Sequence, residues 1–268
     1  MAAVAAEFRI TPAGTRMALN RMVARGVLQA ERIGRQTGFR APPHLRPLLD
    51  EAVLRIFEFG RSARPWGGTW TMVAFSLPEE QRSVRNMLRT RLRWLGFAPL
   101  YDGLWVCPHE RADRAAALLG ELGVATATVL TGRVPPTSPA GGDPIRAWDL
   151  AELRNTYEGF LSRFARDRAR VLAGQVSAAE ALVIRTELMD RWRLFSNADP
   201  DLPAELLPAD WPLPAAVRLF SDIYDGLAEL AAGRFAELVS SVDPSLADQV
   251  RYRTTSAPGL VGRCPRSR

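Results

Sequence analysis

The chain of 268 residues contains no lysine and few groups suited to covalent or metal chemistry. It has two cysteines, Cys107 and Cys264, and two histidines, His44 and His109. Two cysteines imply no disulfide framework, and they are compatible with a reducing compartment. A structural zinc site needs about four ligands, so the "CPHE" stretch with Cys107, His109 and Glu110 does not predict one. Neither histidine lies in a recognisable catalytic motif. We expect no enzyme, no metal and no cofactor.

Long apolar runs are also missing. The most lipid-like stretch, "AAALLGELGVATATVL", is interrupted by Glu121 and two glycines, which is typical of a core helix followed by a buried strand. The first residues, "MAAVAAEFRI", lack the charged start and the long apolar core of a signal peptide. We therefore expect a cytoplasmic protein with no membrane segment.

What the chain has in excess is arginine, which supplies all 35 basic residues. Residues 1–46 contain eight of them against Glu7 and Glu31, so this segment accounts for the whole net charge of +6. A basic amino-terminal module on a neutral body is typical of a nucleic-acid binder. The planar guanidinium also suits phosphate and guanine. The alternative is an ordinary solvated basic surface.

Two stretches rich in proline and glycine, 59–68 and 133–144, divide the chain. We expect domains at 1–58, 66–132 and 145–246. The segment after residue 246 is rich in arginine and poor in apolar residues, so we expect it to be disordered.

The stretch "TPAGTRMALNRMVARG" predicts a short helix with two different sides. Thr11 suits the N-cap, proline follows at the first helical position, and Gly26 suits the exit. One side carries a mostly apolar stripe: Thr15, Leu19, Met22 and Val23. The opposite side carries most of the polar residues: Ala13, Arg16, Met17, Asn20 and Arg21.

The next stretch, "VLQAERIGRQTGFR", predicts a two-stranded hairpin with a basic tip at "RIGR". The stretch "AAVAAEFRI" favours a short helix before the helix that begins after Thr11. The resulting order, two helices followed by a hairpin, is that of a winged helix-turn-helix. On that interpretation the polar side enters a major groove, where Arg reads guanine, Asn reads adenine and Met17 touches a thymine methyl. A solvated polar face, which any surface helix has, is the alternative.

The middle module predicts strands and helices in the order βαββαβ, the ferredoxin-like arrangement. Its first helix would turn Val84, Met87, Leu88, Leu92 and Leu95 inward and end at glycine. In "FAPLYDGLWVCP" we expect two strands around a turn in which glycine 103 takes positive φ. An arginine run on the outer helix face favours a solvated surface over a DNA contact; it consists of Arg82, Arg85, Arg89 and Arg93.

The last module predicts three helices, over 147–174, 177–196 and 215–238. Ser177 and Glu180 form a capping box at the start of the second helix. Eight aromatic residues favour a hydrophobic core over a ligand pocket; they are Tyr157, Phe160, Phe164, Trp192, Phe195, Trp211, Phe220 and Tyr224. The fold class is therefore a multidomain α+β protein with a winged helix-turn-helix, a ferredoxin-like middle domain and a mainly α-helical carboxy-terminal domain.

Three stretches together resemble a known family. "FSLPEEQRSVRNMLRTRLRWLGFAPLYDGLWVCP" resembles the middle domain of the PaaX-type repressors, the regulators of phenylacetic acid degradation. "RTELMDRWRLFSNADPDLPAELLPADWPLPAAVRLFSDIY" is similar to their carboxy-terminal domain, and "TRMALNRMVARGVLQAERIGRQTGF" to their recognition helix and wing. The resemblance implies a homodimeric repressor of a catabolic operon. In this family an acyl-CoA thioester, typically phenylacetyl-CoA, releases the repressor from double-stranded operator DNA.

Only the recognition helix and the wing match the family position by position. The DNA-binding residues predicted there are Thr15, Arg16, Asn20, Arg21, Arg25, Arg32 and Arg35. The family has another helix ahead of this module, and about ten residues precede Thr11 here. We expect a translation start further upstream; otherwise the module lacks a wall, which would expose Leu19 and Met22.

Alternatives remain at three points. The middle module also resembles a small CRISPR-associated nuclease fold, but "AFSLPEE" supplies no metal-binding Asp at the end of its first strand. Arg191, Trp192 and Arg193 are a weak candidate for a CoA-phosphate and stacking site. Finally, the chain could be an acyl-CoA or partner-binding regulatory module that has lost DNA binding.

Overall fold

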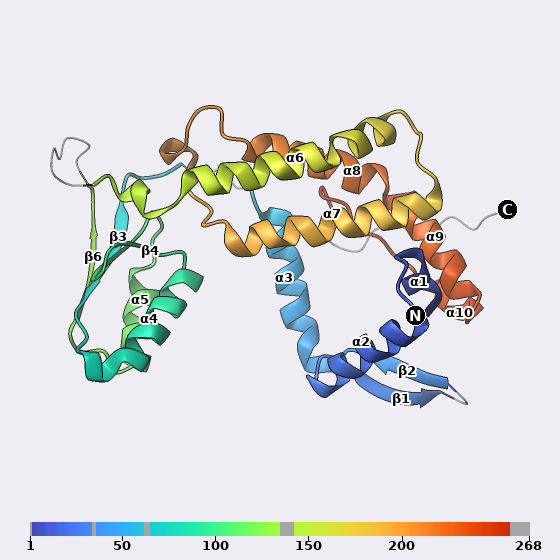
Figure 1. Ribbon diagram of the computed structural model, residues 1–268, viewed down its shortest axis with the longest axis horizontal. Helices are drawn as coiled ribbons and strands as arrows, with labels where there is room; N and C mark the ends of the chain where they lie inside the picture. The colour runs from blue at the N-terminus through green and yellow to red at the C-terminus, as the bar shows by residue number, and fades with distance from the viewer. Residues whose placement is uncertain (1, 34–35, 62–64, 135–141, 258–268) are drawn as a thin grey trace. The chain divides into compact units, whose positions relative to one another are not determined.

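The computed structural model describes residues 2–33, 36–61, 65–134 and 142–257 (Figure 1). It is a mixed α+β structure with two small antiparallel sheets. By contacts the chain divides into two compact units that differ from consecutive domains: one holds residues up to 61, 159–197 and from 213 onward, and the other holds 62–158 and 198–212. Within the described residues, no helix is both long and apolar enough to cross a membrane.

The amino-terminal segment forms the predicted two helices and hairpin. These are α1 (Ala2–Glu7), α2 (Pro12–Ala24), β1 (Gln29–Ile33) and β2 (Gln36–Arg40), followed by α3 (Arg46–Glu58). The hydroxyl of Thr11 accepts the Gly14 N–H at 3.1 Å and caps α2. Gly26 ends the helix with φ of +72°, where glycine avoids the strain of a side chain.

The middle segment confirms the predicted βαββαβ order. It contains β3 (Trp70–Phe75), α4 (Arg82–Trp94), β4 (Ala98–Tyr101), β5 (Leu104–Cys107), α5 (Ala112–Glu121) and β6 (Ala127–Gly132). The sheet order is β4-β5-β3-β6, and Figure 1 shows α4 and α5 side by side on one face of it. Leu88 and Leu92 of α4 are fully buried against this sheet, as the apolar spacing predicted.

Two details of the middle segment correct the sequence analysis. Met87 is 52% exposed, because the row through positions 84, 88, 92 and 95 meets the sheet and position 87 lies outside it. Gly103 does not have positive φ. It is required for space instead, since a Cβ there would lie 2.8 Å from the carbonyl oxygen of Phe75, whose N–H donates to Gly103 O at 2.9 Å.

The remaining elements are helical: α6 (Leu150–Leu172), α7 (Ala178–Ala198), α8 (Leu213–Gly226), α9 (Ala228–Ser240) and α10 (Pro244–Ala247). The single helix expected over 215–238 is wrong, because the chain breaks at Leu227 into α8 and α9. At this break a Cβ on Gly226 would lie 2.7 Å from Val171 Cγ1, so only glycine allows so close an approach to α6.

The aromatic residues of the helical segments form core, as predicted. All eight are at most 9% exposed. In one unit Trp192 stacks on Phe220 with ring centroids 4.5 Å apart, and in the other Tyr157 meets Trp211 edge to face.

The expectation of a disordered carboxy-terminal segment is wrong for residues up to 257. Thr255 is 6% exposed, and its N–H and hydroxyl both donate to the carboxylate of Asp225, at 2.7 and 2.6 Å. Its carbonyl accepts a hydrogen bond from Arg61 at 3.0 Å. These polar bonds, which a count of apolar residues misses, hold the segment in place. Residues 258–268 lie outside the described residues.

The capping box at the start of α7 gives a prediction about pH. Backbone N–H donation from Ser177, followed by donation from Arg170 and from the Ser177 hydroxyl, lowers the pKa of Glu180 from 4.5 to about 2. A lowered pKa in the folded state means a contribution to stability that is complete above pH 4.5 and is lost as the pH falls to about 2. We expect Glu180→Gln to flatten this acid limb slightly, measured as urea midpoints from pH 7 to 2. Glu80→Gln, at an exposed residue, is the control; an equal flattening there would contradict the prediction.

Candidate nucleic-acid interface

Helix α2 has the two sides that its sequence predicted. Leu19 is 6% exposed on the inner side. Arg16, Asn20 and Arg21 are exposed on the outer side, and Met17 is 64% exposed. A pair of guanidiniums, an amide and a thioether therefore form one accessible helix face, and these groups match the hydrogen-bond and methyl pattern of a major groove.

Thr15 lies on the inner side of α2, not with the arginines. It is 8% exposed, and its hydroxyl donates to the carbonyl of Thr11 at 3.0 Å. Its place among the predicted DNA-binding residues came from the family resemblance, while its helical position put it on the apolar stripe. In this structure its hydroxyl bonds within the helix.

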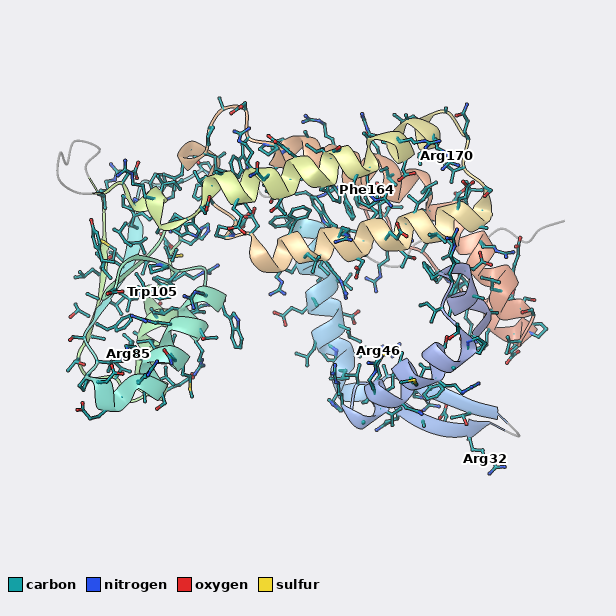
Figure 2. The ribbon with its side chains drawn as sticks, in the orientation of Figure 1. Arg32, Arg46, Arg85, Trp105, Phe164 and Arg170 are labelled. Atoms are coloured by element: carbon teal, nitrogen blue, oxygen red, sulfur yellow. The ribbon has the colours of Figure 1, made fainter. Side chains whose placement is uncertain are left out.

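The hairpin carries exposed arginines on both of its strands. Figure 2 shows Arg32 projecting from the tip of the hairpin, and its side chain is exposed. Arg40 pairs with Glu31 on the neighbouring strand at 2.8 Å, which fixes one basic side chain along the hairpin. Arg25 is exposed directly after α2. The predicted contact residue Arg35 lies outside the described residues.

Helix α1 connects α2 with the carboxy-terminal helix α9. It contacts both α2 and α9 (Figure 1). Glu7 at its end forms an ion pair with Arg234 of α9 at 2.6 Å, with side-chain exposures of 15% and 30%. Leu19 is buried in this arrangement and Met22 is partly buried, so the exposure expected for a missing wall is not seen at Leu19.

Comparison with known protein families assigns the middle segment and the carboxy-terminal helices to two known domains. Residues 63–142 match the PaaX protein central Cas2-like domain, and residues 148–237 match the PaaX-like protein C-terminal domain. Over 230 residues the chain is 29% identical to the transcriptional repressor PaaX of Escherichia coli, covering 83% of this chain and 71% of that one. The chain belongs to the PaaX family.

A solved structure supports the fold of this PaaX-family chain. The uncharacterized protein Rv0674 from Mycobacterium tuberculosis is similar with a TM-score of 0.53 at 23% identity. The similarity covers 84% of this chain and 86% of that one.

The Cas2-like domain of this PaaX-family chain carries no cluster suited to a metal ion within the described residues. Cys107 is fully buried, and burial raises the pKa of its thiol to about 11, which disfavours the thiolate that a metal or a nucleophilic reaction needs. The arginine run on α4 is engaged locally: Arg85 pairs with Glu79, and Arg89 donates to the carbonyl of Asp102 at 3.4 Å. These pairs favour the solvated-face interpretation of the run.

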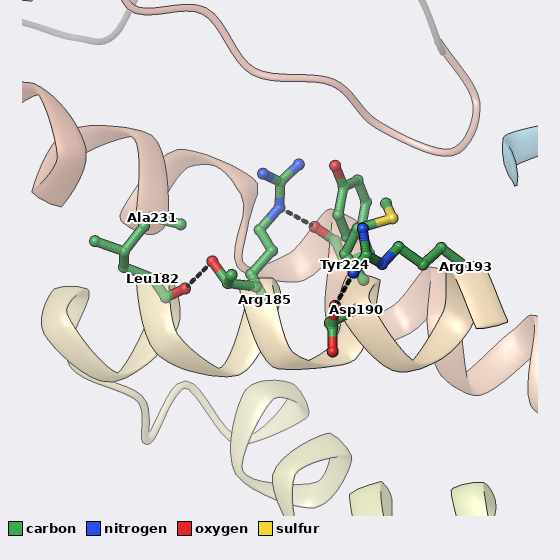
Figure 3. Close-up of a pocket in the computed structure, with 8 residues that line it drawn as sticks. Leu182, Arg185, Asp190, Arg193, Tyr224 and Ala231 are labelled. Atoms are coloured by element: carbon green, nitrogen blue, oxygen red, sulfur yellow. Dashed lines mark hydrogen bonds and ion pairs between the residues drawn. The ribbon is translucent and has the colours of Figure 1, made fainter. Parts of the chain in front are cut away.

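The helices of the family's carboxy-terminal domain contain a feature that sequence reasoning missed. A pocket of about 300 Å³ is lined by residues of α7, α8 and α9 (Figure 3), among them Arg185, Arg193 and Tyr224. The suggested stacking role of Trp192 is wrong, because its ring is 1% exposed inside the aromatic core. Arg185 had no motif around it, so only the packing of α7 against α8 could reveal it.

Proposed function

We propose that this PaaX-family chain is a DNA-binding transcriptional repressor of a catabolic operon and not an enzyme. Helices α1 and α2 and the β1–β2 hairpin act as its winged helix-turn-helix. The exposed polar face of α2, above a buried Leu19, is the observation that carries the proposal. The Escherichia coli relative is named a transcriptional repressor.

In the proposed complex, α2 lies in the major groove. Arg16 or Arg21 donates two hydrogen bonds to a guanine, and Asn20 pairs with an adenine. Met17 offers an apolar contact to a thymine methyl group. Arg25 and the hairpin arginines, Arg32 and Arg35, neutralise phosphates and set the register. Thr15 contributes to this complex indirectly, because its buried side chain helps to pack α2 against the rest of the protein.

The same proposal includes a homodimer and release by an acyl-CoA thioester of the phenylacetyl-CoA type, both implied by the family resemblance. The Arg234–Glu7 ion pair provides a contact through which a change in α9 reaches α1 and the neighbouring α2. Release requires that the effector bind the DNA-free state more tightly, by about 1–3 kcal/mol for a typical coupling.

A titration of the full chain against its own upstream promoter region, followed by fluorescence anisotropy, tests the proposal. We expect specific binding that weakens steeply with salt, as phosphate contacts require. Phenylacetyl-CoA should release the DNA, and free CoA at the same concentration should not. Equal affinity for promoter and scrambled DNA at every salt concentration would refute DNA reading. It would support the second possibility, a regulatory module without DNA binding.

Arg32→Ala is expected to weaken binding about equally on every DNA sequence. Its position at the hairpin tip suits a phosphate contact, and such a contact carries no base information. The slope of log affinity against log salt should fall by about one. The measurement is anisotropy at several salt concentrations on operator and scrambled duplexes. An altered preferred sequence would show instead that Arg32 reads a base.

A further inference from the structure

The pocket between α7, α8 and α9 combines a basic group with an apolar wall. Figure 3 shows the side chains of Arg185 and Arg193 above α7, with Asp190 joined to Arg193. Leu182, Met189 and Ala231 supply its apolar lining, and Thr186 lies exposed among the lining residues. A volume of about 300 Å³ is at the lower end of the range for small-molecule sites, about 300–1,000 Å³.

Arg185 is a partly buried guanidinium held in place by two backbone carbonyls and an aromatic ring. Its Nε donates to the carbonyl of Tyr224 at 3.0 Å, and one terminal nitrogen donates to the carbonyl of Arg253. The guanidinium carbon lies 3.7 Å from the centroid of the Tyr224 ring. Within the described residues no carboxylate forms an ion pair with Arg185, and its Nη1 makes no hydrogen bond.

Burial makes the charge of Arg185 costly. Burial lowers the pKa of Arg185, against the opposing influence of Tyr224 and Asp225. A cation removed from water gains most from an anion that forms two parallel hydrogen bonds with it. Two carbonyls and an aromatic ring fix the direction of the guanidinium, so little conformational freedom remains to be lost on binding.

The nearby carboxylates are occupied by other partners. Asp190 pairs with Arg193 at 2.7 Å, and Asp225 accepts the two hydrogen bonds from Thr255. Of the charged residues that line the pocket, two are arginines and one is an aspartate, so the net charge of the lining is positive.

We propose that this pocket is a binding site for a small organic carboxylate. The carboxylate pairs with Arg185, and the apolar body lies against Leu182, Met189 and Ala231. The site uses none of the residues of α2 or the hairpin. Its occupation can therefore be measured on the DNA-free protein, independently of whether the chain binds DNA.

The experiment uses the full chain without DNA and titrates benzoate, benzamide and inorganic phosphate by isothermal calorimetry and ligand-observed NMR. Benzoate and benzamide have nearly the same shape but differ in charge, and phosphate has the charge without the apolar body. We expect benzoate to bind at least tenfold more tightly than either of the other two. Equal affinity for benzamide would overturn the role of the charge, and equal affinity for phosphate would overturn the role of the apolar wall.

Three variants locate the site. We expect Arg185→Gln to weaken benzoate binding at least tenfold, while Arg191→Gln, the same change at an exposed α7 residue outside the pocket lining, leaves it unchanged. Thr186→Trp fills the pocket from an exposed position and should abolish binding without removing a core contact. If Arg185→Gln does not fold, as judged by circular dichroism, Thr186→Trp alone decides. Unchanged benzoate affinity in the folded variants would overturn the proposal.

Discussion

Arg16→Ala is expected to lower operator affinity by about 1–3 kcal/mol, roughly 5- to 150-fold, and to relax the preference at one base pair. The guanidinium of Arg16 lies on the exposed face of α2 and forms no ion pair within the described residues. In the proposed complex a bidentate bond to guanine is lost with it, and no other base offers that pair of acceptors in the major groove.

The measurement is a set of anisotropy titrations against the operator and its single-base variants. Arg114→Ala is the matched control, because it removes the same charge from an exposed position on α5 of the Cas2-like domain. Weakening by the same factor on every DNA sequence would show that Arg16 contacts phosphate. No change at all would remove α2 from the interface.

Trp192→Ala is expected to destabilise the protein by about 3–5 kcal/mol. The ring is 1% exposed, stacks on Phe220 and packs against Phe59 and Phe160. Its indole N–H donates to the carbonyl of Ile56 at 3.2 Å, so truncation also leaves that carbonyl without its partner. The loss therefore combines a large cavity with a broken polar bond between α7 and the end of α3.

Urea unfolding followed by circular dichroism measures this loss, and Trp94→Ala is its control. Trp94 has the same side chain but is 82% exposed, so its truncation should change stability by less than about 0.5 kcal/mol. Similar effects in the two variants would contradict the placement of Trp192 in the core. They would return it to consideration as a ligand-stacking residue.

The sequence determined the local structure at helix ends and along apolar stripes, where the signal lies in residues close together in the chain. Thr11 and Gly26 marked the ends of α2, and Ser177 with Glu180 marked the start of α7, because cap geometry depends on residues a few positions apart. The spacing of apolar positions determined the βαββαβ order, and charge distinguished the segment for which we propose DNA binding.

Close approaches between distant segments could not be predicted from the sequence. Gly103 was assigned a backbone conformation that it does not adopt, since its actual constraint is the carbonyl of Phe75 on another strand. The break at Leu227 sits beside Gly226 and Val171, which are far apart in the chain. Thr255 was assigned to a disordered segment because of that segment's composition, which does not reveal that its acceptor, Asp225, lies 30 residues earlier in α8.

The sequence by itself therefore determined the amino-terminal hairpin, the βαββαβ order, the caps of α2 and α7, the aromatic core and the exposed arginine face of α2. Only the tertiary structure decided which polar groups meet: Glu7 with Arg234, Thr255 with Asp225, and Arg185 with two backbone carbonyls. The physical reason is the distance along the chain over which each interaction acts. Periodicity and capping act within one or two turns, whereas hydrogen bonds and ion pairs join residues that only the packed chain brings together.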